Sequence, residues 1–124
     1  MTEEHRIQNE IRAGVKSCVL FRTNAGDFWQ GKVVYSREFK QNVLINLRRI
    51  EGLPEGHSDL SGVRVTDGKA VFIEVKTPSG RPTAAQKNFI KKMRSYGAVA
   101  GVCRSAEEAI ALCSISQNTE YYGG

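Results

Sequence analysis

The segment DLSGVRVTDGKAVFIEVKTPSGRPTAAQ, residues 59–86 of this 124-residue chain, contains the clearest structural signals. Two runs typical of β-strands, Val63–Thr66 and Lys69–Lys76, flank Asp67-Gly68, a pair that favours a two-residue hairpin turn. A helix is predicted from Thr83 to about Tyr96, with Gln86 completing a capping box at its start and Gly97 ending it. The segment therefore predicts an antiparallel hairpin followed by a helix.

The register of this hairpin places three charged residues together. In a two-residue turn at Asp67-Gly68, continued pairing brings Asp59 opposite Lys76. Side chains alternate between the faces of a strand, and cross-strand partners share a face. We therefore expect Asp59, Glu74 and Lys76 on one face at one end of the hairpin, with Glu74 diagonal to Asp59. A bulge at Gly62 would shift this register by one residue.

Two neighbouring carboxylates predict a metal site. Asp59 and Glu74 would repel each other without a cation between them, and carboxylate oxygens suit Mg²⁺ or Mn²⁺. Such an ion polarises a phosphoryl oxygen and lowers the pKa of a bound water. Lys76 would orient that water or neutralise charge on the phosphate. The alternative interpretation is an exposed ion pair between Glu74 and Lys76 on the solvent side of a strand.

The distribution of charge favours a polyanionic partner. The chain has 18 Lys and Arg against 13 Asp and Glu, a net charge of +5. No acidic residue lies between Glu74 and Glu107, and the same interval contains Lys76, Arg81, Lys87, Lys91, Lys92, Arg94 and Arg104. A stretch of one sign attracts nucleic-acid phosphates. A solvated, lysine-rich helix face is the alternative.

The rest of the chain predicts a small mixed sheet flanked by helices. Helices are expected over 3–16 and from Ala106 to about Cys113, and strands over 18–22, 32–37, 43–50 and 99–103. The fold class is therefore α/β with a mixed α+β sheet. Trp29 and Tyr35 are interpreted as packing residues rather than base-stacking residues. We expect one domain over residues 1–115 and a polar tail over 116–124.

Several functional classes are excluded by composition. No apolar run reaches the ~18 residues of a membrane span. The N-terminus MTEEHRIQNE is unlike a signal peptide, and three widely spaced cysteines argue for a reducing compartment. The expected location is therefore cytoplasmic, with no membrane partner. The loop Thr77–Gly80 is too short for a phosphate-binding nucleotide loop, so no nucleotide cofactor is expected.

These residues resemble the PD-(D/E)xK nuclease core, and more closely its VRR-NUC branch. The resemblance covers about residues 3–112 and rests on blocks in the same order: Glu4–Gln8, Arg22–Gly26, Gly56–Leu60, Ile73–Gln86 and Gly97–Ser105. Ser58 stands where the family usually has proline before the motif aspartate. The resemblance implies a restriction-endonuclease-like αβββαβ core, here with an extra hairpin and a C-terminal helix.

The resemblance also implies roles for individual residues. It makes Asp59, Glu74 and the carbonyl of Val75 ligands of Mg²⁺ or Mn²⁺, and Lys76 the catalytic lysine. Glu4 would reach the metal through water, although a first-turn acid also suits the helix dipole. Gln86 would lie near the scissile phosphate, although its helix-capping role alone would explain it.

Basic residues are candidates for contacts with the DNA backbone. Lys87, Lys91 and Arg94 share one face of the predicted helix, and such contacts position DNA without reading its sequence. Arg22 and Asn24 are further candidates, although both also suit the turn in which they lie. Arg81 in the following loop completes the predicted set.

The resulting hypothesis is a metal-dependent endonuclease that cuts branched DNA. Short, stand-alone members of this branch resemble virus-type homodimeric Holliday junction resolvases, which would act in the host cytoplasm. A symmetric junction offers two equivalent strands, which favours an enzyme with two active centres. The alternatives are a monomeric flap or nicking nuclease that works with a helicase or replication protein, and a DNA-binding module of the same fold that does not cut.

Overall fold

Nine elements form the structure, a computed structural model that describes residues 1–23 and 27–114. The predicted tail over 116–124 lies outside the described residues. In chain order the elements are α1 (Glu3–Gly14), β1 (Cys18–Arg22), β2 (Asp27–Ser36), β3 (Gln41–Glu51), β4 (Leu60–Arg64), β5 (Ala70–Val75), α2 (Ala84–Ser95), β6 (Val99–Cys103) and α3 (Ala106–Cys113).

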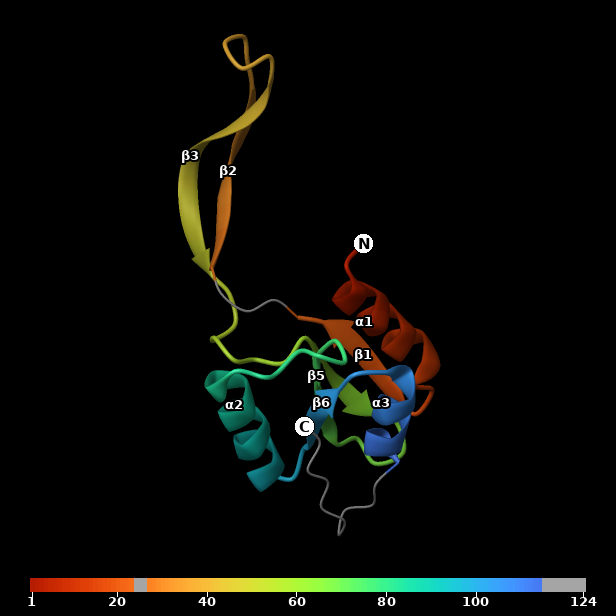
Figure 1. The fold of residues 1–124 in the computed structure, drawn as a ribbon. Helices are drawn as coiled ribbons and strands as arrows, with labels where there is room; N and C mark the ends of the chain where they lie inside the picture. Colours follow the sequence, from red (N-terminus) through yellow and green to blue (C-terminus); the bar gives the residue numbers. More distant parts are fainter. Residues whose placement is uncertain (24–26, 115–124) are drawn as a thin grey trace.

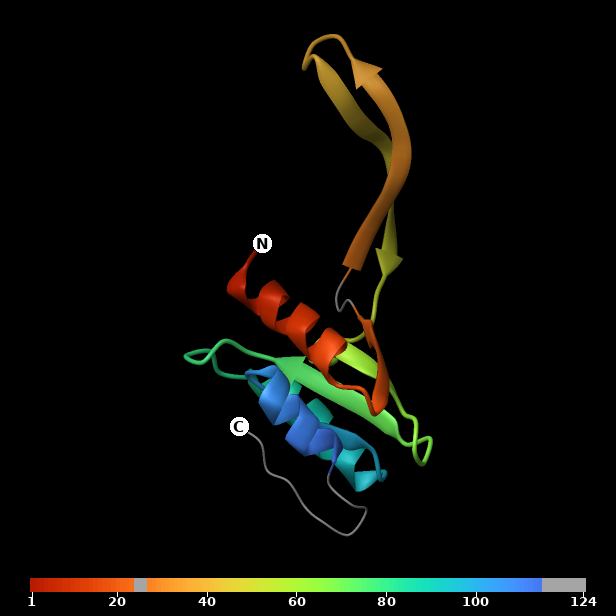
Figure 2. The same ribbon diagram turned by 90° about the vertical axis from the view of Figure 1, so that its right-hand side faces the viewer.

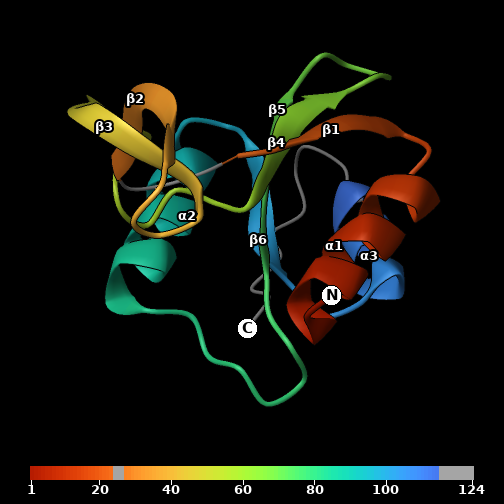
Figure 3. The same cartoon turned by 90° about the horizontal axis from the view of Figure 1, so that it is seen from above.

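A four-stranded sheet, in the order β1-β4-β5-β6, forms the middle of three layers. Its first three strands are antiparallel neighbours, and β6 runs parallel to β5. Helices α1 and α3 lie on one side of the sheet and α2 on the other (Figure 3). The predicted mixed fold is confirmed: α1, β1, β4, β5, α2 and β6 form the αβββαβ core, to which β2, β3 and α3 are added.

Both faces of β5 are buried, because helices cover the sheet on both sides. Val71, Ile73 and Val75 are fully buried against residues of α1 and α3, among them Ile11. Phe72 faces the other way and packs with a smaller cluster under α2. Glu74 alternates with the core residues and so belongs to the α2 side of the sheet. A charged residue at this position is therefore not on a solvent face.

The predicted two-residue turn at Asp67-Gly68 is wrong. Leu60 pairs with Ile73 and Val63 with Ala70, two residues away from the expected register. A type I′ turn needs positive φ at both central residues, and here only Gly68 has it, with φ of 71°. The Asp67 carboxylate instead accepts hydrogen bonds from the backbone N–H of Lys69 and from Arg64.

Arg64 explains why the longer loop is stable. Its buried guanidinium lies 2.6 Å from the Asp67 carboxylate and donates a 2.9 Å hydrogen bond to the carbonyl of Cys113 at the end of α3. The hairpin loop is thereby attached to a distant helix. A shift of two residues preserves the alternation of faces, so the predicted face of Asp59 and Glu74 is unchanged.

Strands β2 and β3 form a separate two-stranded sheet that projects from the core, which we call the arm (Figures 1 and 2). Both strands are longer than predicted, and their ladder shifts between Gln30 and Lys32, where Asn46 adopts φ of 54°. Trp29 and Tyr35 are 61% and 64% exposed. Their interpretation as packing residues is therefore wrong within this chain, because the arm strands pair only with each other.

The predicted helices are confirmed, with ends set by local capping. The Thr2 hydroxyl accepts from the backbone N–H of His5, and Thr83 and Gln86 form the predicted capping box of α2. Helix α1 ends at Gly14, two residues before the predicted end. None of the helices in the described part of the chain has the length and apolar character to cross a membrane.

Candidate active site

Asp59 is held at the point where three strands meet. It directly precedes β4, and its carbonyl accepts a 2.8 Å hydrogen bond from the backbone N–H of Thr23, which follows β1. Its carboxylate oxygen Oδ2 accepts a 2.8 Å hydrogen bond from the backbone N–H of Val75. Because Leu60 pairs with Ile73, the next position along the ladder brings Asp59 opposite Glu74 rather than opposite Lys76.

Glu74 is a buried acid with one unused oxygen. Its side chain is 1% exposed, Oε1 lies 3.6 Å from the Nζ of Lys76, and Oε2 has no hydrogen-bond partner among the described residues. Burial, followed by the neighbouring Asp59 carboxylate, raises the pKa of Glu74 to about 8, while Lys76 acts in the opposite direction. The alternative interpretation, an exposed surface ion pair, is therefore wrong.

The donor set fits a hard divalent cation. A carboxylate oxygen without a partner in a buried position leaves an acceptor unused, and a second carboxylate lies beside it. Among the described residues, no three or more His, Cys, Asp or Glu side chains lie together in an arrangement that could hold a metal ion. Two carboxylates supplemented by a backbone carbonyl such as that of Val75 are nevertheless a ligand set that Mg²⁺ accepts, because it retains several waters.

The loop before Asp59 is fixed against α2 by a glycine. Gly56 has φ of 91°, and a Cβ at this position would lie 2.6 Å from the carbonyl oxygen of Ala85. Only glycine fits both the backbone conformation and this close approach. The loop that carries the acidic residue is therefore positioned by the first turn of α2.

Three aromatic side chains support the same loop, and sequence analysis missed this cluster. His57 packs against Phe72 of β5 and Phe89 of α2, with ring centroids 5.8 and 4.7 Å apart. Its Nδ1 lies 3.0 Å from the carbonyl oxygen of Ser58. No signal in the sequence connects these rings, because the contact depends on how α2 crosses the sheet.

Ser58 was also not identified as a site residue. It is 1% exposed, its hydroxyl has no hydrogen-bond partner among the described residues, and its carbonyl accepts from the hydroxyl of Thr23. Its position next to Asp59 was visible in the sequence. Its burial was not, because the loop is held by residues distant in the sequence, Thr23 after β1 and Ala85 of α2.

Glu4 and Gln86 are not in contact with the acidic pair. Glu4 is half-buried in the first turn of α1, and no hydrogen bond or ion pair joins it to Asp59 or Glu74 in the described chain. The side-chain oxygen of Gln86 accepts a 2.8 Å hydrogen bond from the backbone N–H of Thr83. Its amide nitrogen is left for another acceptor. The functional roles of both residues stay predictions.

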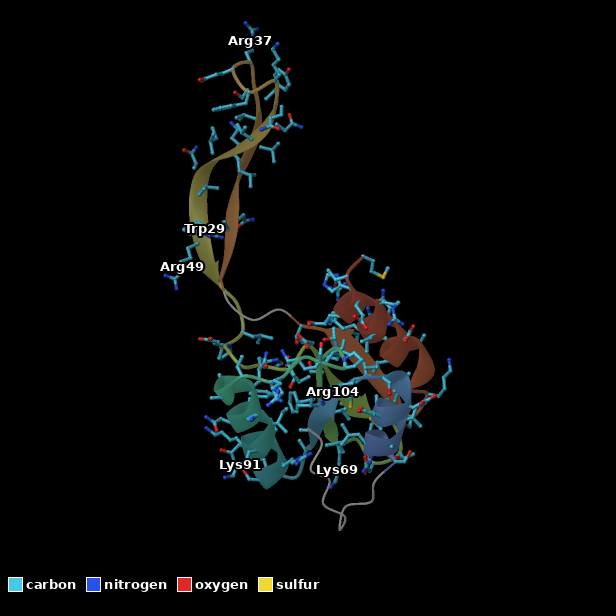
Figure 4. The ribbon with its side chains drawn as sticks, in the orientation of Figure 1. Trp29, Arg37, Arg49, Lys69, Lys91 and Arg104 are labelled. Carbon is cyan, nitrogen blue, oxygen red and sulfur yellow. The ribbon has the colours of Figure 1, made fainter. Side chains whose placement is uncertain are left out.

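The candidate DNA-contact residues differ in exposure. Arg22 and Arg81 are exposed, as are Lys87 and Lys91 on α2, where Lys91 points away from the core (Figure 4). Arg94 is half-buried and donates a 2.7 Å hydrogen bond to the carbonyl of Ala100, so this side chain does not extend with the two lysines. Asn24 lies outside the described residues.

Comparison with known families gives one match. The model of the VRR-NUC domain matches residues 6–107, which is most of the chain and includes Asp59, Glu74, Lys76 and Gln86. Glu4 lies two residues before the matched range. A search of curated proteins gave no match.

Proposed function

We propose that this chain, which belongs to the VRR-NUC domain family, is a Mg²⁺- or Mn²⁺-dependent endonuclease that cuts branched DNA. The family has a PD-(D/E)xK-like nuclease fold. The observation that carries the proposal is the pairing of the buried Glu74 with the half-buried Asp59. In its ionised form, an acid that is 1% exposed, beside a second carboxylate and with Oε2 unpartnered, is unfavourable unless a cation binds there.

Three groups would hold the ion: the side chains of Asp59 and Glu74 and the carbonyl of Val75. A bound Mg²⁺ or Mn²⁺ supplies Lewis acidity toward the phosphate and lowers the pKa of a water. The protein orients Asp59 in advance, because the Val75 N–H fixes one of its oxygens at 2.8 Å. The other carboxylate oxygen of Asp59 remains available to coordinate the metal ion.

Lys76 is the proposed catalytic lysine. Its Nζ lies 3.6 Å from Glu74 Oε1, and its side chain is 16% exposed, so the ammonium is at the boundary between the buried pair and solvent. From there it would hydrogen-bond a non-bridging phosphate oxygen and the attacking water. Such a donor stabilises negative charge that develops on the phosphate as the new P–O bond forms.

Two further residues would complete the site. Gln86 already uses its side-chain oxygen in the helix cap, so its amide N–H group is the part that would contact the scissile phosphate. Glu4 would act through water. Helix α1 begins at the end of the core from which the arm emerges, and the ends of β1 and β5 lie there too (Figure 1).

The proposed substrate is a four-way DNA junction, cut by a homodimer. A junction presents two equivalent strands, which a two-fold symmetric enzyme with two centres matches. The net charge of +5 supports a nucleic-acid partner. The exposed lysines Lys87 and Lys91 would contact the DNA backbone, together with Arg22, Asn24 and Arg81.

The test is cleavage of a labelled four-way junction, with flap, nicked and linear duplexes as controls, in Mg²⁺, Mn²⁺ or EDTA. We expect paired, symmetric cuts in the junction only when metal is present. Asp59→Asn should abolish cutting and leave binding intact, because the variant loses a metal ligand and a negative charge that faces the phosphate. Glu107→Gln, which neutralises an exposed acid of α3, is the matched control and should cut normally.

The other outcomes discriminate between the alternatives. Cutting of flaps or single strands would retain the nuclease and reject the resolvase. Metal-independent binding without cutting in either ion would favour a non-cleaving DNA-binding module. Cutting by Asp59→Asn at the rate of the unmodified protein would reject the assigned site.

A further inference from the structure

The arm has one face that is apolar and exposed. The faces can be assigned because Trp29, Val33 and Tyr35 alternate along β2 and therefore share a face. Leu44 pairs with Val33 and therefore lies on this face. The Leu47 side chain lies over Gly31, which alternates with Trp29 and Val33, so Leu47 belongs to the same face. These five side chains, which we call the apolar face, are between 50% and 64% exposed.

The opposite face of the arm is more polar. Lys32 pairs with Ile45, and Arg48 donates a 2.9 Å hydrogen bond to Gln30. Val34 and Val43 on this face are half-buried, unlike the residues of the apolar face. The arm is therefore an amphipathic ribbon whose apolar side is the more exposed one.

No element of the described chain covers the apolar face. Strands β2 and β3 pack mainly against each other, and the arm extends away from the helices and the four-stranded sheet (Figures 1 and 2). An isolated two-stranded ribbon is at best marginally stable in water. Contiguous exposed apolar surface of this kind is typical of a surface that binds another protein.

The charge of the apolar face argues against DNA as its occupant. Of the described strand side chains on this face, Arg49 beside Trp29 is the one that carries a charge (Figure 4). Binding to a phosphate backbone requires several cations. Aliphatic and aromatic groups without cations instead match a second apolar surface.

The area agrees with a second copy of the same face. Each of the five side chains exposes on the order of 100 Å², so two faces packed together would bury about 1,000 Å², which reaches the lower limit for a specific interface. A surface that binds its own copy around a two-fold axis must be complementary to itself. An apolar face that is almost without charge meets this condition, because face-to-face packing of two such faces places no like charges in the centre of the interface.

We propose that the arm is the homodimer interface, in which the apolar faces of two copies pack against each other. The inference rests on the proposed function only for its purpose, which is to bring two cutting centres to one junction. Association itself does not depend on catalysis. The arm joins the core between β1 and Asp59, so an interface here would connect directly to the loops around the acidic pair.

The test compares two neighbouring substitutions on β3 that point to opposite faces. Leu44→Asp would place two charges in the proposed interface, and Ile45→Asp, beside Lys32, is its control. Sedimentation equilibrium of the full chain should give a dimer for the unmodified protein and the control. We expect Leu44→Asp to raise the dimer dissociation constant about 100-fold or more, because a buried, unpaired charge is unfavourable.

A second measurement excludes simple loss of folding. Hydrogen exchange of the unmodified protein, followed as it is diluted through dissociation, should accelerate at the amides of β2 and β3 and remain unchanged at those of β5. A monomer at all concentrations, or a dimer in which both variants still associate normally, would overturn the inference.

The nuclease assay separates this inference from the proposed function. A monomeric Leu44→Asp protein should still nick DNA but lose paired cuts. If no variant cuts any DNA, the proposed function fails while sedimentation still decides the interface. If Asp59→Asn remains a dimer, as expected, dimerisation is independent of the acidic pair.

Discussion

Replacing Glu74 by Gln is expected to stabilise the metal-free protein at alkaline pH. The native environment raises the pKa of Glu74 from 4.5 to about 8, first through burial and then through the Asp59 carboxylate. An acid with a higher pKa in the native state binds its proton more tightly there than in the unfolded chain. The contribution of Glu74 to the stability of the native state is therefore complete below pH 4.5 and is lost as the pH rises through about 8.

The size of the effect follows from the same shift. A difference of about 3.5 pKa units, at about 1.36 kcal/mol for each unit, sets an upper limit of about 5 kcal/mol at high pH. Solvent near the half-buried Asp59 screens part of this. We therefore expect Glu74→Gln to be about 2 kcal/mol more stable than the unmodified protein at pH 9 and nearly equal to it at pH 5.

Urea unfolding in EDTA, followed by circular dichroism between pH 5 and pH 9, measures this difference. Glu107→Gln is the control and should show none. If the free energy of unfolding of Glu74→Gln differs from that of the unmodified protein by the same amount at every pH, the raised pKa of Glu74 is wrong.

The same variant tests for metal. At a concentration of Mg²⁺ about 100 times its dissociation constant, the unmodified protein should gain about 2.7 kcal/mol, and Glu74→Gln should gain much less. Stabilisation of both proteins by the same amount would place the cation elsewhere.

Three further perturbations test the fold and the DNA surface. Arg64→Met should destabilise the protein by about 2 kcal/mol in chemical unfolding, because it leaves the buried carbonyl of Cys113 at the end of α3 without its donor. The hydrogen bond from Arg64 lowers the pKa of Asp67 from 3.8 to about 2. The difference in stability between the unmodified protein and Arg64→Met should therefore begin to decrease below pH 3.8 and continue to decrease as the pH falls through about 2. Gly62→Ala should lower stability by about 3 kcal/mol, because its Cβ would lie 1.7 Å from the carbonyl oxygen of Val19; an unchanged unfolding midpoint would contradict the close β1–β4 approach. Lys91→Ala should weaken DNA binding uniformly across sequences and reduce the salt slope by about 1, measured by fluorescence anisotropy at several salt concentrations.

The order of the elements was predictable from local signals. The stripe of Ile7 and Ile11, the capping box of Thr83 and Gln86, and the alternation in Ala70–Val75 each depend on residues near one another in the chain. The placement of Asp59 and Glu74 on one face was also predictable, because a register error of two residues does not change the face.

The register itself was not predictable from the turn. Asp67-Gly68 favours a two-residue hairpin, but Arg64 recruits the Asp67 carboxylate and reaches the carbonyl of Cys113, 49 residues away. A contact at that sequence separation leaves no local pattern. In the register that accompanies this contact, Glu74 rather than Lys76 lies opposite Asp59.

Local sequence patterns were enough to predict the chemical groups of the site, the helices and strands that carry them, and the basic stretch beside them. The burial of Glu74 and the separation of the arm from the core sheet depend instead on how the elements pack. Alternation along β5 is the same whether one face is covered or both are, and only the packing of α2 on the second face removes Glu74 from water. In the same way, alternating apolar residues form a core strand or an exposed arm depending on whether another element packs against them.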